Sequence, residues 1–359
     1  MTKLWINMGP QHPMTHGLWN LKILVDGETI VDAEPVLGYL HRGVEKLCER
    51  RTYNQIIPLA DRLCYVSSLC FAHAYCLTVE EMMDLEIPER AKYLRVIALE
   101  LQRVTSHMTW LMAIGPDVGL ITLLLYCLRE REYFLDLLQL QTGARMNQNY
   151  PRIGGVSQDI PSNFEHKAIK IIDKFKVRVK DYHKVTNESS AFLKRMQGVG
   201  TLSVEDAIAY GVTGPNIRGS GAKLDMREHD PYEVYDELDW EIQVRDEGDS
   251  LARFHVRMGE MQESCKIILQ ALKKMPDGPI NVKAPLRPEG QSFRRTEDSR
   301  GEVSYYVVGN GGESPYRLKV RSPIFCTMNV LPKLLTGVNV ADVLAIMGSI
   351  DVCIGETDK

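Results

Sequence analysis

The spacing of apolar residues changes along the chain and divides it into three regions. Apolar and polar positions alternate loosely over 18–25 and 29–36, and the Asp26-Gly27 pair between them predicts a two-stranded hairpin. Further along, apolar residues recur at the intervals of a helix. This pattern predicts four long helices over 88–112, 118–140, 163–196 and 250–274. After Pro276 the sequence predicts two strands within Glu302–Val320 around a turn at 309–313, and then a short helix and a tail over 340–359.

These elements predict an α+β fold with a central helical bundle between β-rich ends. We expect one domain over residues 1–359, with a β-hairpin region at 1–40, a mainly helical core at 41–275 and a β-rich region with a tail at 276–359. The 44% of hydrophobic and 25% of charged residues are ordinary for a globular protein. The longest apolar run, Val118–Leu128, is too short to span a bilayer, so work at a membrane would be that of a peripheral subunit. The net charge of -4 argues against nucleic acid as a partner.

The eight cysteines lie mostly in apolar segments, and no CxxC motif occurs. No secretory signal precedes them, because the start of the chain is polar and rich in proline. We therefore expect reduced, buried thiols, and no metal or cluster bound by this chain alone.

Two segments combine titratable groups with a rigid or apolar frame. The loop Asn7–Gly17 carries His12 and His16, and its prolines make a regular helix unfavourable. A histidine on such a loop could donate a proton near neutral pH, although a capped turn before the hairpin explains the pattern as well. The segment Asp61–Tyr75 places Tyr65 in an apolar helical frame, either as a proton donor or as a satisfied group of a core helix.

Three charged positions have structural interpretations. Asp117 stands just before a very apolar helix, where capping and the helix dipole would explain a carboxylate. The run Leu128–Tyr133 predicts an internal ion-pair network or a subunit contact. The segment Glu297–Arg321 could form a polar clamp, but its pattern favours a solvated face.

Eleven short motifs follow one another in an order that resembles a known family. They are GPQHPxxHG, GYLHRGVEK, DRLxYVS, DVG, REREY, GARM, RIGGV, RGSG, SRGEV, PYRLKVRSP and IMGSID. Together they cover the chain and resemble the 49-kDa-type subunit of complex I, the respiratory NADH:quinone oxidoreductase. The resemblance implies a [NiFe]-hydrogenase large-subunit-like fold.

In those hydrogenases two CxxC motifs hold nickel and iron. The similar positions here are Cys64 with Ser67 and Cys353 with Glu356. Two thiols in place of four should not hold a bimetallic centre, so the resemblance implies no metal. If the fold brings Cys64 and Cys353 together, an adventitious metal, a disulfide or a persulfide is conceivable.

The resemblance also implies a quinone site in place of the metal. His16 and Tyr65 would bind the headgroup, with Asp117 as the partner of His16, and these groups could supply the two protons of quinone reduction. Electrons would come from a [4Fe–4S] cluster in an adjacent subunit, beside Arg42. The implied partners are that small subunit of the 20-kDa (PSST) type, a 30-kDa-type subunit and membrane subunits that form the quinone tunnel, on the cytoplasmic side of a membrane.

One position departs from the family pattern. Many relatives have a histidine after GARM, close to the cluster, where this chain has Asn147. Without a titratable group there, we expect a cluster potential that is low and depends little on pH. This favours a low-potential acceptor such as menaquinone or a phenazine over ubiquinone.

Three other hypotheses remain. The chain could be a sulfur-reducing relative that uses the thiols of Cys64 and Cys353. It could be a [NiFe]-hydrogenase subunit, which would need thiols at Ser67 and Glu356, or a structural scaffold, which would tolerate changes at His16 and Tyr65. The sequence does not identify the electron donor, which could be NADH, ferredoxin or a deazaflavin coenzyme.

Overall fold

The fold begins with a small antiparallel sheet. The computed structural model describes residues 3–10, 17–283 and 286–359. Strands β1 (Leu4–Met8), β2 (Asn20–Asp26) and β3 (Thr29–Val36) pair in the order β1-β2-β3. The inner residues Leu21, Ile23 and Ile30 are fully buried, and the sheet packs on the C-terminal helix α12 (Pro323–Leu335). Alternation of side chains along β2 therefore gives the sheet one core face and one outer face.

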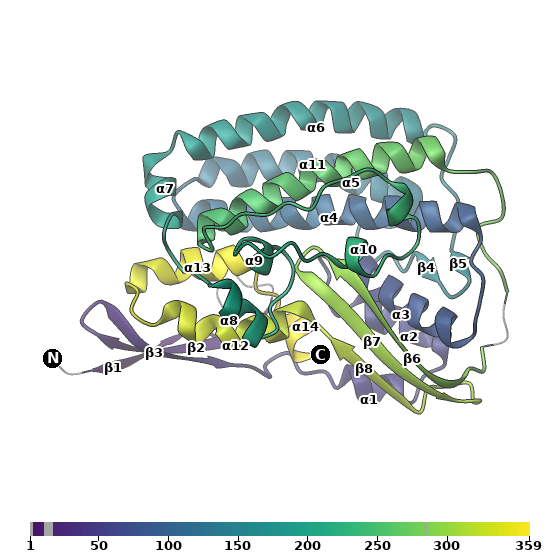
Figure 1. Ribbon diagram of the computed structural model, residues 1–359, viewed down its shortest axis with the longest axis horizontal. Coiled ribbons are helices and arrows are strands. Elements are labelled where there is room, and N and C mark those ends of the chain that lie inside the picture. The colour runs from purple at the N-terminus through teal and green to yellow at the C-terminus, as the bar shows by residue number, and fades with distance from the viewer. Residues whose placement is uncertain (1–2, 11–16, 284–285) are drawn as a thin grey trace.

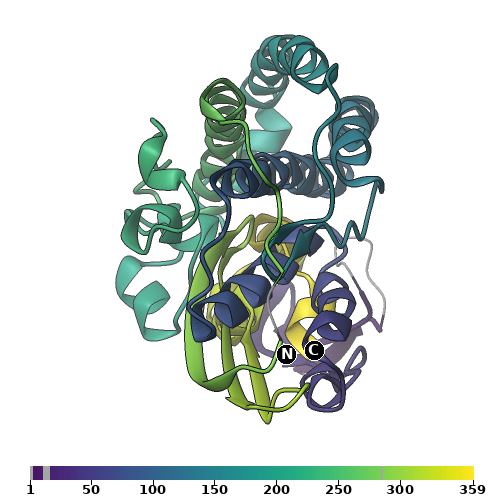
Figure 2. The same cartoon turned by 90° about the vertical axis from the view of Figure 1, so that its right-hand side faces the viewer.

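A layer of long helices forms the upper half of the molecule in Figure 1. It contains α4 (Glu89–Asp117), α5 (Ile121–Thr142), α6 (Phe164–Asn187) and α11 (Ser250–Lys274). Helix α4 lies between α5 and α11 and is buried on nearly all sides, which is why it carries apolar residues around its whole circumference. Figure 2 shows this helical layer above the strands and the shorter helices.

A second antiparallel sheet lies beneath the helices. It has the order β6-β7-β8, from β6 (Glu289–Asp298), β7 (Gly301–Asn310) and β8 (Arg317–Arg321). Helix α3 (Ser68–Met82) packs across β6 and β7, and its buried side chains share a core with Val303, Tyr305 and Val307.

The remaining elements are short and connect these layers. They are α1 (Val44–Cys48), α2 (Tyr53–Asp61), β4 (Pro151–Arg152), β5 (Gly155–Val156), α7 (Ser190–Met196), α8 (Val204–Ala209), α9 (Pro215–Arg218), α10 (Met226–His229), the 3-10 turns Tyr235–Glu237 and Val340–Asp342, α13 (Val343–Ile350) and α14 (Ile354–Asp358). Among the described helices, none combines the length and the apolar composition that a bilayer crossing requires.

The expected α+β class, with a helical core between strands, is confirmed, but several details were wrong. Asp61–Tyr75 is not one helix, because α2 ends at Asp61 and α3 begins at Ser68. The helix expected over 163–196 is interrupted where Ser189 caps α7 by accepting a hydrogen bond from the amide of Phe192. Strand β6 and helix α12 were not predicted.

The placement of Asp117 also needs correction. It is the last residue of α4 and not the start of the next helix, whose N-cap is Leu120. A carboxylate at a helix C-terminus gains nothing from the helix dipole. The structural explanation that the sequence favoured for Asp117 therefore does not hold.

Candidate functional site

Three junctions between elements meet at one buried place. The α2–α3 turn contributes Cys64, the turn between β6 and β7 contributes Arg300, and the junction of α13 with α14 contributes Cys353. The sulfur atoms of Cys64 and Cys353 lie 3.5 Å apart, and Nη1 of Arg300 lies 3.3 Å from the Cys64 sulfur. All three side chains are fully buried. The fold therefore brings together the two thiols that the sequence placed near opposite ends of the chain.

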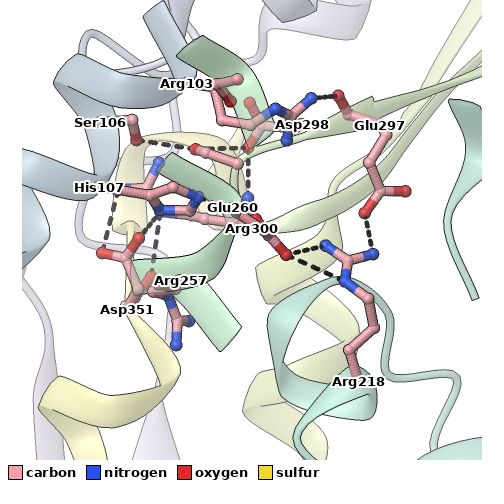
Figure 3. Close-up of polar contacts among 12 residues, drawn as sticks. Arg103, Ser106, His107, Arg218, Arg257, Glu260, Glu297, Asp298, Arg300 and Asp351 are labelled. Atoms are coloured by element: carbon pink, nitrogen blue, oxygen red, sulfur yellow. Dashed lines mark hydrogen bonds and ion pairs between the residues drawn. The ribbon is translucent and has the colours of Figure 1, made fainter. Parts of the chain in front are cut away.

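Arg300 contacts two carboxylates, Asp351 and Asp298 (Figure 3), as well as the sulfur of Cys64. Its Nε donates to the main-chain oxygen of Asp351 at 3.1 Å, and its Nη2 donates to the carboxylate of Asp351 at 3.2 Å. Its own amide donates to Asp298, which also accepts a hydrogen bond from the hydroxyl of Ser67. Burial alone would lower the pKa of Arg300, but Asp351 and the thiols outweigh it and raise that pKa well above its usual value. A fixed positive charge thus stands beside Cys64.

The thiols share their site with Glu356, on the first turn of α14. One ligand atom from each of Cys64, Cys353 and Glu356 lies within 4.8 Å of the others. Burial first, and Cys353 second, raise the pKa of Cys64; burial first, and Cys64 second, raise that of Glu356. Its buried position therefore favours the protonated form of Glu356. Cys64 and Cys353 could bind a soft metal ion only as thiolates. Arg300 adds a cation beside one sulfur, and that cation would repel a metal ion. The site therefore fits two neutral thiols better than a metal ion.

Tyr65 follows Cys64 in the turn and lies at the edge of this place. It is 43% exposed, whereas Cys64 is fully buried. Partial burial, and then the neighbouring Cys353 and Cys64, raise the pKa of Tyr65 to about 12. Tyr65 also affects the pKa of Arg131 in α5. Burial lowers that pKa, and Tyr65 acts in the opposite direction. Tyr65 is therefore a protonated phenol, able to donate, between solvent and the buried thiols.

The loop expected to carry proton donors is described only at its ends. His12 and His16 lie outside the described residues. Gly17 has a φ of +123°, and a Cβ there would collide with Leu40 and come within 3.1 Å of Ile354. The described end of the loop is therefore held against α14, next to Cys353.

Asp117 lies at the end of α4, with one carboxylate oxygen buried. Helix α4 is itself tied to α13, because Trp110 donates to the main-chain oxygen of Gly348 at 2.6 Å. The pairing of Asp117 with His16 stays a prediction.

Arg42 lies on the outer side of these junctions, and Asn147 lies in the loop between α5 and β4. Arg42 donates to the main-chain oxygens of Arg62, at 2.9 Å, and Gly355, at 2.7 Å. Asn147 has a positive φ of 52° and accepts a hydrogen bond from the side chain of Asn149, at 3.0 Å. Arg42 is exposed and Asn147 is half-buried, so both positions can face a neighbouring subunit.

The residues of the turn between β6 and β7 were not foreseen. The sequence favoured a solvated face for Glu297–Arg321, but Glu297, Asp298 and Arg300 are at most 2% exposed. Glu297 pairs with Arg218 and Arg300 pairs with Asp351, partners that are distant in sequence. The later part of the segment, with Glu313, Tyr316 and Lys319, matches the expected surface.

One sequence signal could have revealed the charged interior. Arg253, Arg257 and Glu260 recur at intervals of four and three residues on α11, on a face that also carries apolar side chains. Charges at helical spacing among buried residues indicate an internal network.

Comparisons with known proteins agree with one another. Residues 117–287 and 282–359 match the model of the family described as respiratory-chain NADH dehydrogenase, 49 Kd subunit. An NADH-quinone oxidoreductase subunit of Geobacillus thermodenitrificans is 45% identical over 357 residues, which cover 98% of both chains. The corresponding subunit of Bacillus anthracis is 43% identical over 360 residues, 99% of this chain and 98% of the relative.

A solved structure is similar over the same length. It is described as the membrane-bound sulfane sulfur reductase, an archaeal respiratory membrane complex. The matching chain has a TM-score of 0.95 and 36% sequence identity, over 99% of this chain and 98% of that one.

Proposed function

The chain belongs to the family of the 49-kDa subunit of the respiratory-chain NADH dehydrogenase, and on this premise we propose that it forms the electron-acceptor site of a membrane respiratory oxidoreductase. In this proposal electrons pass from a [4Fe–4S] cluster in an adjacent subunit to a membrane quinone or phenazine. The observation that carries it is the position of Tyr65, a protonated phenol between solvent and a buried pair of thiols.

The residues around Tyr65 suit the chemistry of such an acceptor. Reduction of a quinone to a quinol takes two electrons and two protons. Tyr65 can hydrogen-bond a quinone oxygen and donate the first proton, and Glu356 holds another proton behind it. We propose His16, paired with Asp117, as the donor for the other oxygen. Arg300 would stabilise negative charge that develops on the headgroup, since it is buried and always charged.

The electron supply would come from neighbouring subunits. We propose that the exposed Arg42 and the adjacent Asn147 face the small [4Fe–4S] subunit of the 20-kDa type. A 30-kDa-type subunit would complete the peripheral part, and membrane subunits would admit the quinone tail. The chain would then act as a peripheral subunit on the cytoplasmic side, and acceptor reduction would be coupled to ion translocation by the assembled complex. NADH, ferredoxin or a deazaflavin coenzyme would deliver electrons through other subunits.

The direct test is Tyr65→Phe in the intact complex. We expect electron transfer from the native donor to a short-chain quinone or phenazine to fall about 10²-fold, because a positioned proton donor contributes roughly that much or more. Tyr316→Phe serves as the matched control, because Tyr316 is 70% exposed and lies in the β7–β8 hairpin, where its amide donates to Val308. The electron paramagnetic resonance signal of the cluster reports assembly. Unchanged turnover in Tyr65→Phe would place the acceptor elsewhere.

The close approach of Cys64 and Cys353 supports a second candidate function, reduction of sulfane sulfur. The two thiols lie 3.5 Å apart, and the Arg300 guanidinium beside Cys64 acts against the rise in its pKa that burial causes. The pair could reduce the polysulfide R–S–S–S–R to R–S–SH and R–SH and become a Cys64–Cys353 disulfide, which two electrons and two protons would restore to thiols. The resemblance to a chain of a sulfane sulfur reductase complex favours the same chemistry.

Substitution of the thiols separates the two candidates. Cys64→Ser and Cys353→Ser should abolish reduction of a polysulfide while leaving quinone reduction within about twofold, if sulfur is the substrate of the thiols. Loss of quinone reduction alone would assign the site to the quinone. Hydrogenase activity is not supported, because Ser67 donates to Asp298 and Glu356 stands where a further thiol would be required.

A further inference from the structure

A cluster of buried ionisable side chains lies near Arg300 and Asp351, and Figure 3 shows five of its members, Arg103, His107, Arg218, Glu260 and Glu297. It is built from α4, α9, α10, α11 and the end of β6, and none of its members is more than 3% exposed. The members are Glu100, Arg103, His107, Arg218, Asp225, Arg227, Glu260 and Glu297. Two buried tyrosines, Tyr232 and Tyr235, also face it.

Four carboxyl groups of this cluster share the three guanidinium groups of Arg103, Arg218 and Arg227, and a fourth guanidinium, that of Arg257, lies near Glu260. His107 adds no positive charge to them. Nε2 of His107 lies 2.9 Å from Glu260, while its Nδ1 is buried and has no hydrogen-bond partner among the described residues. A neutral imidazole that donates from Nε2 fits this environment, because an imidazolium would bury an unpaired N–H. Burial lowers the pKa of His107 accordingly.

Three of the four carboxylates are well compensated. Glu260 accepts two hydrogen bonds from Arg218, at 3.0 and 2.7 Å, and a third from His107. Asp225 accepts two from Arg227, at 2.9 and 2.7 Å. Glu100 accepts from Arg103, Arg227, Ser264 and Tyr235.

Glu297 is the least compensated member. One of its oxygens accepts a single bond from Nη1 of Arg218, at 2.7 Å, and the other accepts from the amide of Met226, at 3.1 Å. Asp225 lies 3.3 Å from the same Nη1, so two carboxylates compete for one guanidinium nitrogen. Burial, and then the charge of Asp225, raise the pKa of Glu297 to about 7. Among the four carboxyl groups, Glu297 is therefore the one whose charge is least supported by its partners.

Charged groups join this cluster to the thiol site. Arg300 is paired with Asp351 and touches Cys64. Arg257 interacts with both Asp351 and Glu260. Burial lowers the pKa of Arg257 to about 10, and the two carboxylates limit this decrease. Arg218 then connects Glu260 with Glu297. Because each step lies in a buried, low-dielectric interior, negative charge added near Cys64 is felt at Glu297.

We propose that Glu297 is an internal proton-binding group that takes up one proton when the acceptor site is reduced and releases it when the reduced acceptor leaves. The proposal rests on the function proposed for the chain. The step is conversion of the Glu297 carboxylate and one proton from solvent into a carboxylic acid. The electrons go from the neighbouring cluster to the acceptor, and none resides on Glu297.

The test is a reduced-minus-oxidised infrared difference spectrum of the intact complex with quinone at mildly alkaline pH. We expect a new band of a protonated carboxyl, shifted in D2O, in the wild type and in Glu302→Gln, and none in Glu297→Gln. Glu302 is the matched control, because it lies opposite Glu297 in the sheet register but pairs with Arg321. A band that persists in Glu297→Gln, or that disappears equally in Glu302→Gln, overturns the proposal.

Isotope labelling tests the same assignment without a substitution that could impair folding. Carboxyl-labelled glutamate should shift the band of the wild-type complex, and labelled aspartate should not. A shift with aspartate alone, or no carboxyl band at all in a complex that reduces quinone, refutes the role of Glu297 and leaves the proposed function intact. Failure of the wild-type complex to reduce any quinone or phenazine refutes the proposed function itself.

Discussion

Replacing Arg218 by methionine would remove the guanidinium that serves three buried carboxylates. Methionine nearly fills the same volume, so the main cost is electrostatic. Without Arg218, Glu260 would have to remain charged without its main partner or take up a proton. Protonation of a glutamate with an ordinary pKa costs about 1.4 kcal/mol per pH unit, hence roughly 4 kcal/mol at pH 7 and roughly 1 kcal/mol at pH 5. The first value agrees with the about 3–5 kcal/mol expected when one partner of a buried ion pair is lost.

The pH dependence gives the sign of the effect. In the wild type the pKa of Glu260 is held well below its usual value by Arg218 and His107 against the effect of burial, so its charge stabilises the fold above the pKa of the unfolded chain. Between pH 7 and pH 5 this stabilisation of the wild type is fully present. In Arg218→Met the buried Glu260 has to take up a proton, and because that protonation costs less at lower pH, the difference in the free energy of unfolding should shrink from pH 7 to pH 5.

Urea unfolding of the purified chain, followed by tryptophan fluorescence, measures this difference. Arg287→Met is the control, because Arg287 and Glu313 form a pair 3.2 Å apart whose side chains are 67% and 69% exposed. Its cost should stay below about 1 kcal/mol at both pH values. An equal cost of Arg218→Met at pH 7 and pH 5 would show that lost packing, and not charge, explains the effect.

Three further changes test other parts of the molecule. Gly355→Ala should destabilise the fold by about 1–3 kcal/mol in urea, since the added Cβ would lie 2.7 Å from the main-chain oxygen of Leu63; an unchanged midpoint would contradict this contact. Asn147→His should make the potential of the neighbouring cluster more dependent on pH, towards about 59 mV per pH unit in a redox titration, whereas a steep slope already in the wild type would refute the reasoning. Ser322→Ala should cost about 1 kcal/mol, because Ser322 caps α12 by accepting from the amide of Phe325, and a calorimetric scan that shows no loss would exclude this cap.

Local signals predicted the parts of the fold that depend on neighbouring residues. The Asp26-Gly27 turn gave the hairpin of β2 and β3, and helix α11 has the bounds that its apolar period indicated. Strand β6 escaped because its sequence is polar. Its charges are matched by residues far along the chain, as in the hydrogen bond of Ser292 with Glu81 and the ion pair of Arg295 with Asp230. No window of the sequence contains both partners.

In the candidate site, too, the sequence revealed some residues and missed others. The order of motifs pointed to Tyr65 and to the positions of Cys64 and Cys353, because the resemblance spans the whole chain. Pattern alone treated Arg300 as part of a surface, since a run of charges is usually solvated. Only the tertiary structure shows that Arg300 is enclosed by Asp351 and a thiol.

The contact between the α2–α3 turn and α14 can form only late in the synthesis of the chain. Cys64 and Cys353 are separated by 289 positions, so the ribosome must complete almost all of this sequence before the second thiol exists. Until then Arg300 has no Asp351, and the turn that carries Tyr65 has no α14 against it. Contacts between such distant segments form late, after the local helices. The nascent chain therefore cannot form the junction of Cys64, Arg300 and Cys353 until α14 has been made.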